Sequence, residues 1–129
     1  MKDAAITDFG LTATDFEFTY VKQDGADGTI RTDDIRLYGS AGKATGNKLT
    51  FTMKTAGKKI TTIKIEFSSA SYGTAAKILD GDGNVVTANA DGSYTINSTS
   101  FTIVNDNTGM ASNTQVRFKS IKIYTAALQ

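Results

Sequence analysis

Apolar and polar residues alternate along most of this 129-residue chain. Phe16, Phe18 and Tyr20, for example, share one parity, and the residues between them are polar. Neighbouring side chains of an extended strand point to opposite sides, so such a segment fits a strand with one buried face. Turn-forming residues interrupt the alternation about every eight to twelve positions, a spacing typical of a β-sandwich or barrel. The pattern therefore predicts an all-β fold, and no segment predicts a helix.

The number of short strands favours two sheets packed face to face. We expect a two-sheet antiparallel β-sandwich, jelly-roll-like, that forms a single domain over residues 1–129. The alternating segments 49–53 and 63–67 lie on either side of a turn at Gly57. These two segments are predicted to pair as a hairpin.

The last expected strand changes phase partway along. Val116 and Phe118 share one parity, whereas Ile121 and Ile123 have the other. A β-bulge near Lys119-Ser120 would bring both pairs to the core, because one inserted residue resets the alternation. The sequence therefore predicts a bulge at this point.

Missing residue types exclude several kinds of chemistry. Without Cys or His the chain has no disulfide, no thiolate nucleophile, no imidazole base and no ordinary zinc site. Its only glutamates are Glu17 and Glu66, both on the polar side of an expected strand. A glycosidase needs two nearby carboxylates, one of them with a raised pKa. We therefore expect a protein that is not an enzyme.

The charge balance argues against nucleic acid as the partner. The chain has 14 basic and 13 acidic residues, a net charge of +1, which provides no strong field to attract a phosphate backbone. No apolar stretch approaches the roughly 20 residues that cross a bilayer, and the first residues lack an apolar signal core. We expect a soluble monomer as the chain stands, without membrane insertion.

The order of expected strands from Asp34 onward provides a resemblance. Strands at 35–38, 47–51 and 60–67 are followed by a closing strand at 114–124. This order resembles the β-sandwich modules repeated in exported proteins of gut and other anaerobic bacteria, where they accompany glycan-degrading enzymes, nucleases or surface proteins. The resemblance implies an accessory role in the extracellular space or at the cell surface, and it implies no particular binding residues.

Two tyrosines suggest a carbohydrate-binding surface, because a sugar ring offers an apolar face and a rim of hydroxyls. Tyr38 has the parity of Arg36, opposite to the apolar residues beside it, and Tyr72 lies in a Ser-rich loop as the best candidate for an exposed ring. With nearby Asn47, these residues form the predicted contact set. We expect a non-catalytic carbohydrate-binding or adhesion-type module whose partner is a glycan or another cell-surface polymer. An ordinary structural role is the alternative for each tyrosine.

The other tyrosines have core parity. We expect them to be buried except at the hydroxyl: Tyr20, Tyr94 and Tyr124.

Oxygen-bearing side chains at Asp80, Asp82 and Asn84 are spaced two apart, and Asp91 falls where an EF-hand places its last ligand. The EF-hand motif is incomplete, since Val85 replaces its glycine and the flanking helices are missing. Two interpretations remain open, a structural calcium site or hairpin turns that favour Asp and Gly. A second acidic region leaves the same alternatives: Asp24, Asp27, Asp33 and Asp34.

A structural spacer or assembly domain of a bacterial surface protein, with no small ligand, is the alternative function. Thr-rich, Cys-free sandwiches of that kind sometimes contain an isopeptide bond from Lys to Asn or Asp. Each such bond lowers the intact mass by one ammonia or one water.

Overall fold

The computed structural model describes residues 15–31 and 33–128, which form ten strands and one short 3-10 helix. Their order is β1 (Phe16–Val21), β2 (Thr29–Ile30), β3 (Ile35–Gly39), β4 (Lys48–Met53), β5 (Lys58–Phe67), η1 (Ala70–Gly73), β6 (Ala76–Asp80), β7 (Val85–Val86), β8 (Tyr94–Ser98), β9 (Ser100–Asn105) and β10 (Thr114–Ala127). No helix in this described part is long and apolar enough to cross a membrane.

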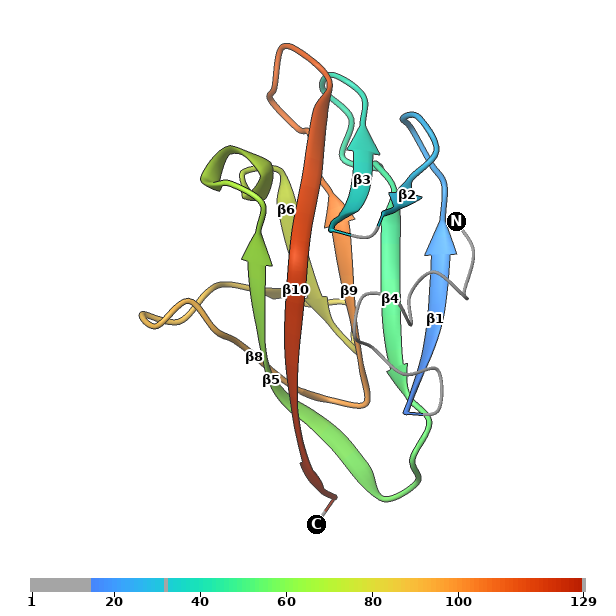
Figure 1. Cartoon of the computed structure of the whole chain (residues 1–129), viewed down its shortest axis with the longest axis vertical. Helices are drawn as coiled ribbons and strands as arrows, with labels where there is room; N and C mark the ends of the chain where they lie inside the picture. Colours follow the sequence, from blue (N-terminus) through green and yellow to red (C-terminus); the bar gives the residue numbers. More distant parts are fainter. Residues whose placement is uncertain (1–14, 32, 129) are drawn as a thin grey trace.

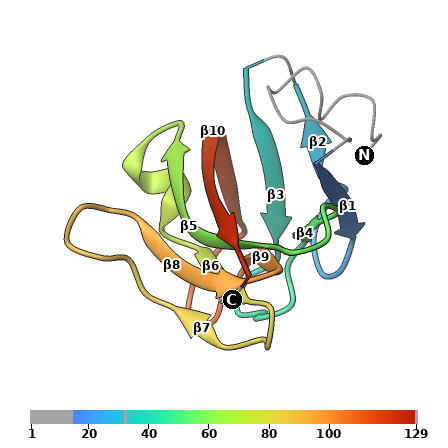
Figure 2. The ribbon, with the colours of Figure 1, turned by 90° about the horizontal axis from the view of Figure 1, so that it is seen from below.

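The strands form two five-stranded antiparallel sheets that face each other (Figures 1 and 2). Sheet A has the order β1-β4-β9-β6-β7 and sheet B the order β2-β3-β10-β5-β8. If β3 to β10 are counted as strands one to eight, the two orders become 2-7-4-5 and 1-8-3-6. This interleaved order is that of a jelly roll, to which β1 and β2 add one edge strand each. The predicted all-β, jelly-roll-like antiparallel sandwich is confirmed.

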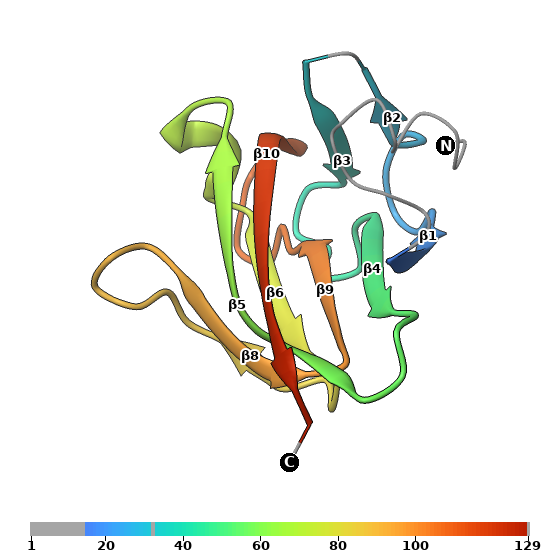
Figure 3. The ribbon, with the colours of Figure 1, turned by 60° about the horizontal axis from the view of Figure 1, so that its bottom comes forward.

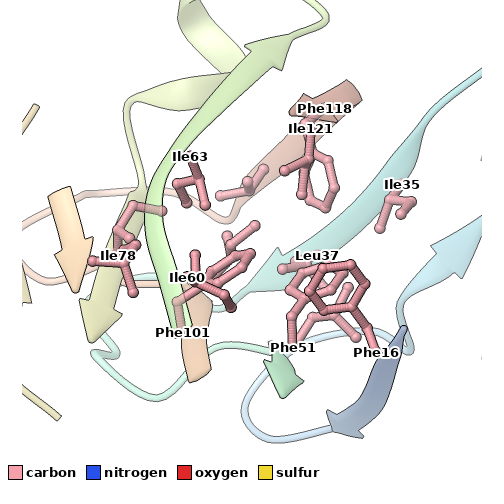
Figure 4. Close-up of a cluster of buried hydrophobic side chains, with 14 of the residues drawn as sticks. Phe16, Ile35, Leu37, Phe51, Ile60, Ile63, Ile78, Phe101, Phe118 and Ile121 are labelled. Carbon is pink, nitrogen blue, oxygen red and sulfur yellow. The ribbon is translucent and has the colours of Figure 1, made fainter. Parts of the chain in front are cut away.

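The core lies between the sheets, where alternate residues of each strand point inward (Figure 4). Phe51 on β4 is at its centre. Its ring stacks on that of Phe101 with centroids 4.8 Å apart, and the ring of Phe18 meets it edge-on at 5.3 Å. Such pairs add about 0.5–1.5 kcal/mol beyond the burial of apolar area. Alternation in the sequence has thus sorted the side chains into an interior and an exterior.

The predicted bulge in β10 is present. Phe118 is the Cα partner of Phe67 on β5, but the next residue of β5, Glu66, is partnered by Ser120. Lys119 is the inserted residue. Phe118 and Ile121 are both buried as a result, at 0% and 9% exposure.

The predicted hairpin of 49–53 and 63–67 is wrong. The first segment lies in β4, which pairs with β1 and β9, whereas the second lies in β5, which pairs with β10 and β8. The turn at Gly57 therefore carries the chain from one sheet to the other. Alternation specifies which side of a strand is buried and says nothing about its neighbour.

The burial expected for Tyr124 is also wrong, because its side chain is 49% exposed. Behind the bulge, the inward positions of β10 are those of Ile121 and Ile123, so Tyr124 points to the outer side of sheet B. Tyr20 and Tyr94 are half-buried.

A buried amide joins the two sheets at the opposite end of the sandwich. Asn105, the last residue of β9, has 0% exposure and donates from Nδ2 to the carbonyl oxygens of Leu37 at 3.0 Å and Thr114 at 3.2 Å. Both acceptors belong to sheet B. Gly39 and Gly46 approach Asn105 so closely that a Cβ at either position would overlap it. A Cβ at Gly39 would meet the amide oxygen of Asn105, and a Cβ at Gly46 would meet its backbone carbonyl oxygen.

Candidate functional site

Three of the four predicted carbohydrate contacts lie on the outward side of sheet B. We call this surface the outer face and define it by nine side chains, which are Arg36, Tyr38, Lys64, Glu66, Tyr72, Gln115, Arg117, Ser120 and Lys122. β10 runs along its middle, with β3 on one side and β5 with η1 on the other (Figure 1). Its side chains face outward because their neighbours in each strand occupy the core.

Tyr38 and Arg36 stand directly opposite two residues of β10. Gln115 is the Cα partner of Tyr38, and Arg117 is the partner of Arg36. All four side chains are half-buried. Gln115 and Arg117 were not among the predicted contacts, although their parity, opposite to that of Val116, indicated that they face outward.

Tyr72 is tied to this row by a contact with Arg117. The guanidinium carbon lies 4.4 Å from the centroid of the tyrosine ring, within the range of a cation–π interaction. The same guanidinium donates from Nε to Oε1 of Gln115 at 2.6 Å. One face of the ring is therefore covered, and Tyr72, the best candidate for an exposed ring, is half-buried. The contact joins residues far apart in sequence, which alternation does not reveal.

Arg36 is held by a carboxylate beside it in the chain. Its Nε donates to both oxygens of Asp34, at 2.9 and 3.1 Å, and Asp34 is only 6% exposed. This hydrogen bond is the main reason that the pKa of Arg36 is raised. The side chain is thus fixed in position.

A cavity opens at each end of the outer face. One, of about 430 Å³, lies beside Tyr38 and Gln115 and is closed by Ala26 and Asn113. The other, of about 300 Å³, lies over the paired strands β5 and β10. Its walls come from Lys64, Glu66, Ser120 and Lys122 and from the Asp91-Gly92 turn. That turn belongs to the loop between β7 and β8, which projects to the side in Figure 3.

A further cavity, of about 470 Å³, lies away from the outer face, where β6 and β7 meet β8. Val86, Tyr94 and Met110 give it apolar walls, and Lys77 and Asp106 line it as an ion pair with Nζ 3.4 Å from Oδ2. None of the predicted site residues lies there.

Asn47 does not belong to the outer face. Its side chain has 0% exposure, donates from Nδ2 to the carbonyl oxygen of Ala26 at 2.6 Å and accepts the backbone N–H of Gln23 at 3.2 Å. Both ends of the amide are occupied in holding the β1–β2 loop, so we remove Asn47 from the contact set. Its position in a Gly-rich loop was misleading, because the loop packs inward there.

The predicted calcium ligands make turn hydrogen bonds instead. Oδ1 of Asp80 accepts the backbone N–H groups of Asp82 and Asn84 at 2.9 and 3.0 Å. Oδ1 of Asp91 accepts the backbone N–H and the hydroxyl of Ser93 at 3.0 and 2.6 Å. Within residues 15–31 and 33–128, no three Asp or Glu side chains gather as they would around a metal ion. The structure therefore does not bring Asp80, Asp82 and Asp91 together.

Carboxylates of the second acidic region are also engaged in local contacts. Asp24 accepts a hydrogen bond from the hydroxyl of Thr45, and Asp27 accepts one from the hydroxyl of Tyr20 at 2.6 Å. Asp34 is paired with Arg36, and Asp33 is exposed. This arrangement favours the turn interpretation.

The two glutamates lie on opposite outer surfaces of the sandwich, Glu17 on β1 in sheet A and Glu66 on β5 in sheet B. They cannot act as a pair. The ion pair with Lys119, at 3.3 Å, is the main cause of the lowered pKa of Glu66. The hydrogen bond from the Ser93 hydroxyl likewise lowers the pKa of Asp91. A general acid needs a raised pKa, so neither carboxylate of the 300 Å³ cavity suits that role.

Comparison of the chain with protein-family models, with curated proteins and with solved structures finds no significant match in any of the three. The function is therefore inferred from the geometry of the outer face.

Proposed function

We propose that this sandwich is a non-catalytic module that binds an extended glycan across the outer face of sheet B. The observation that carries the proposal is the placement of two tyrosines, Tyr38 and Tyr72, on either side of β10. Gln115 and Arg117 lie on β10 between them, and Arg36 lies beside Tyr38 on β3. Aromatic rings offer apolar surface to the faces of sugar rings, and planar guanidinium and amide groups bond to paired hydroxyls.

The fixed geometry of these groups supports binding. Arg117 is held by Tyr72 and Gln115, and Arg36 is held by Asp34, so the donors lose little side-chain entropy when a ligand arrives. The stretch of β10 from Gln115 to Lys122 spans roughly 20 Å at about 3.3 Å per residue. Such a row suits several consecutive sugars of a polymer, with the two cavities at its ends.

A place in a larger secreted or cell-surface protein completes the proposal. It is supported by the resemblance of the strand order from Asp34 onward to accessory modules of exported bacterial proteins, and by the lack of Cys and His, which leaves no thiolate nucleophile and no imidazole base.

Affinity electrophoresis on gels containing plant, host and microbial polysaccharides tests this function. We expect retardation on at least one polysaccharide, and weaker retardation for Tyr38→Ala and Arg117→Gln. Lys48→Gln is the matched control, because Lys48 lies on the outward side of β4 in the opposite sheet. Equal retardation of all four proteins, or none on any polysaccharide, would contradict the proposal.

The alternative role as a spacer has a separate test in the intact mass. Lys77 and Asp106 approach each other, but the pKa of Asp106 is lowered, chiefly by the Thr108 hydroxyl. An ionised carboxylate beside an ammonium group forms an ion pair, whereas an isopeptide bond forms between the neutral amine and the protonated carboxyl group. A mass below that of the sequence by one water or one ammonia would support the spacer role.

A further inference from the structure

Like charges face each other twice across the outer face. Arg117 on β10 is the Cα partner of Arg36 on β3, and Lys122 on β10 is the partner of Lys64 on β5. Side chains at such positions lie about 5 Å apart at Cβ, and like charges placed there destabilise a sheet. The two pairs therefore place positive charge at two points of the outer face.

Neighbouring carboxylates neutralise this charge only in part. Asp34 pairs with Arg36, and Glu66 pairs with the bulge residue Lys119. For Arg117, Lys64 and Lys122, no carboxylate within residues 15–31 and 33–128 lies within 4 Å. Arg117 is held instead by two neutral groups, the ring of Tyr72 and the amide of Gln115.

The outer face has a small excess of positive charge. The outer face and the residues beside it contain five cationic side chains, Arg36, Lys64, Arg117, Lys119 and Lys122, and three anionic ones, Asp34, Glu66 and Asp91. The other charged residues of the ranges 15–31 and 33–128 are eight cations and eight acids, so the excess of positive charge in the described part of the chain lies on this face. An anionic ligand is therefore attracted at short range to the outer face.

We propose that the outer face binds an acidic polysaccharide, with one uronate carboxylate between Arg36 and Arg117 and another between Lys64 and Lys122. This inference rests on the proposed glycan-binding function and names its ligand class. A carboxylate between two cations replaces one repulsion by two attractions, and a guanidinium fork matches a carboxylate in shape.

The spacing of the two pairs selects a polymer. Arg117 and Lys122 are separated along β10 by roughly 15 Å at about 3.3 Å per residue. A chain of repeating uronates reaches both pairs, so the second contact forms at high effective concentration. A single uronic acid reaches only one pair and binds far more weakly.

Nucleic acid fits this face less well. A phosphate backbone has a dense and continuous charge, whereas Glu66 and Asp91 line the lower cavity beside the two lysines. Alternating cations and acids suit a polymer with spaced carboxylates and hydroxyls between them.

The test measures dissociation constants by isothermal titration calorimetry for polygalacturonate, alginate and hyaluronan, each beside its fully methyl-esterified form. We expect the best of the three acids to bind about tenfold or more tightly than its neutral ester, since hydrogen bonds to charged groups are the strong ones. We also expect its affinity to fall as salt rises from 50 to 500 mM. The double variant K64Q/K122Q should lose about tenfold or more, and K48Q should stay within about twofold of the wild type.

Thermal unfolding of each variant confirms that it is folded. Equal affinity for an acid and its ester, unaffected by K64Q/K122Q, would overturn the acidic ligand and leave glycan binding intact. Binding only to neutral polysaccharides would do the same, and binding to no polysaccharide would overturn both proposals. Tighter binding to duplex DNA than to any uronate polymer, lost in K64Q/K122Q, would assign the face to nucleic acid instead.

Discussion

The buried amide of Asn105 provides the sharpest test of what holds the two sheets together. Asn105→Ala removes the Nδ2 donor from the carbonyl oxygens of Leu37 and Thr114, and it removes the acceptor of the Thr114 hydroxyl at 3.3 Å. Each buried acceptor that loses its donor costs about 1–3 kcal/mol. The hydrogen bond to Leu37 is buried and that to Thr114 is only part-buried, so we expect the free energy of unfolding to fall by about 2–4 kcal/mol. A chain of this size should then melt about 10 °C lower, at roughly 3 °C per kcal/mol.

Urea unfolding followed by circular dichroism measures this loss. Asn105→Leu separates the hydrogen bonds from the cavity, because leucine fills the space but donates nothing, and it should also lose about 2 kcal/mol or more. Asn84→Ala is the control, since Asn84 is exposed and the change should stay within about 0.5 kcal/mol. If Asn105→Leu is as stable as the wild type, the amide does not tie the sheets and the reasoning fails.

Lys122→Gln should raise the melting temperature by about 1–3 °C in low salt, because repulsion from Lys64 costs about 0.2–1 kcal/mol. Salt screens this repulsion, so the gain should vanish in about 1 M salt. An unchanged melting temperature in low salt would speak against the repulsion. Burial is the main cause that raises the pKa of Tyr20 from 10.0 to about 12, so its contribution to stability is complete below pH 10 and is lost as the pH rises to about 12. Between these pH values, Tyr20→Phe should therefore lose less stability than the wild type. The free energy of unfolding of both proteins is measured by urea titration at each pH, and an equal loss in both would contradict this reasoning. Gly39→Ala should lower the free energy of unfolding by about 1–3 kcal/mol, since its methyl group meets the amide of Asn105, and a neutral effect would show that this end can relax.

The fold class could be predicted because alternation is a local property of the sequence. It specified the inward side of each strand, and the phase change between Phe118 and Ile121 was enough to locate the bulge. Pairing is different, since it depends on partners far away in the chain. The segments 49–53 and 63–67 have the same pattern whichever sheet they join, and this is why the predicted hairpin was wrong.

The outer face could be predicted only in part for the same reason. Parity placed Tyr38 and Arg36 on the outside of their strand. The pairs that give the face its charge require the register of β10 against β3 and β5, which no single segment contains. Asn47 was misassigned because the burial of a polar side chain depends on which backbone groups surround it, and the partners of Asn47 come from the β1–β2 loop.

The bulge at Lys119 makes the length of β10 as important as its composition. Upstream of it, Val116 and Phe118 face the core, and downstream Ile121 does so only because one extra residue intervenes. Loss of a single codon here would turn Ile121 to the solvent and Lys122 toward the interior, at a cost on the order of 3 kcal/mol for the isoleucine alone. A substitution in this strand thus changes one side chain at a time. An insertion or deletion would instead exchange the inward and outward positions over half of the strand in one step.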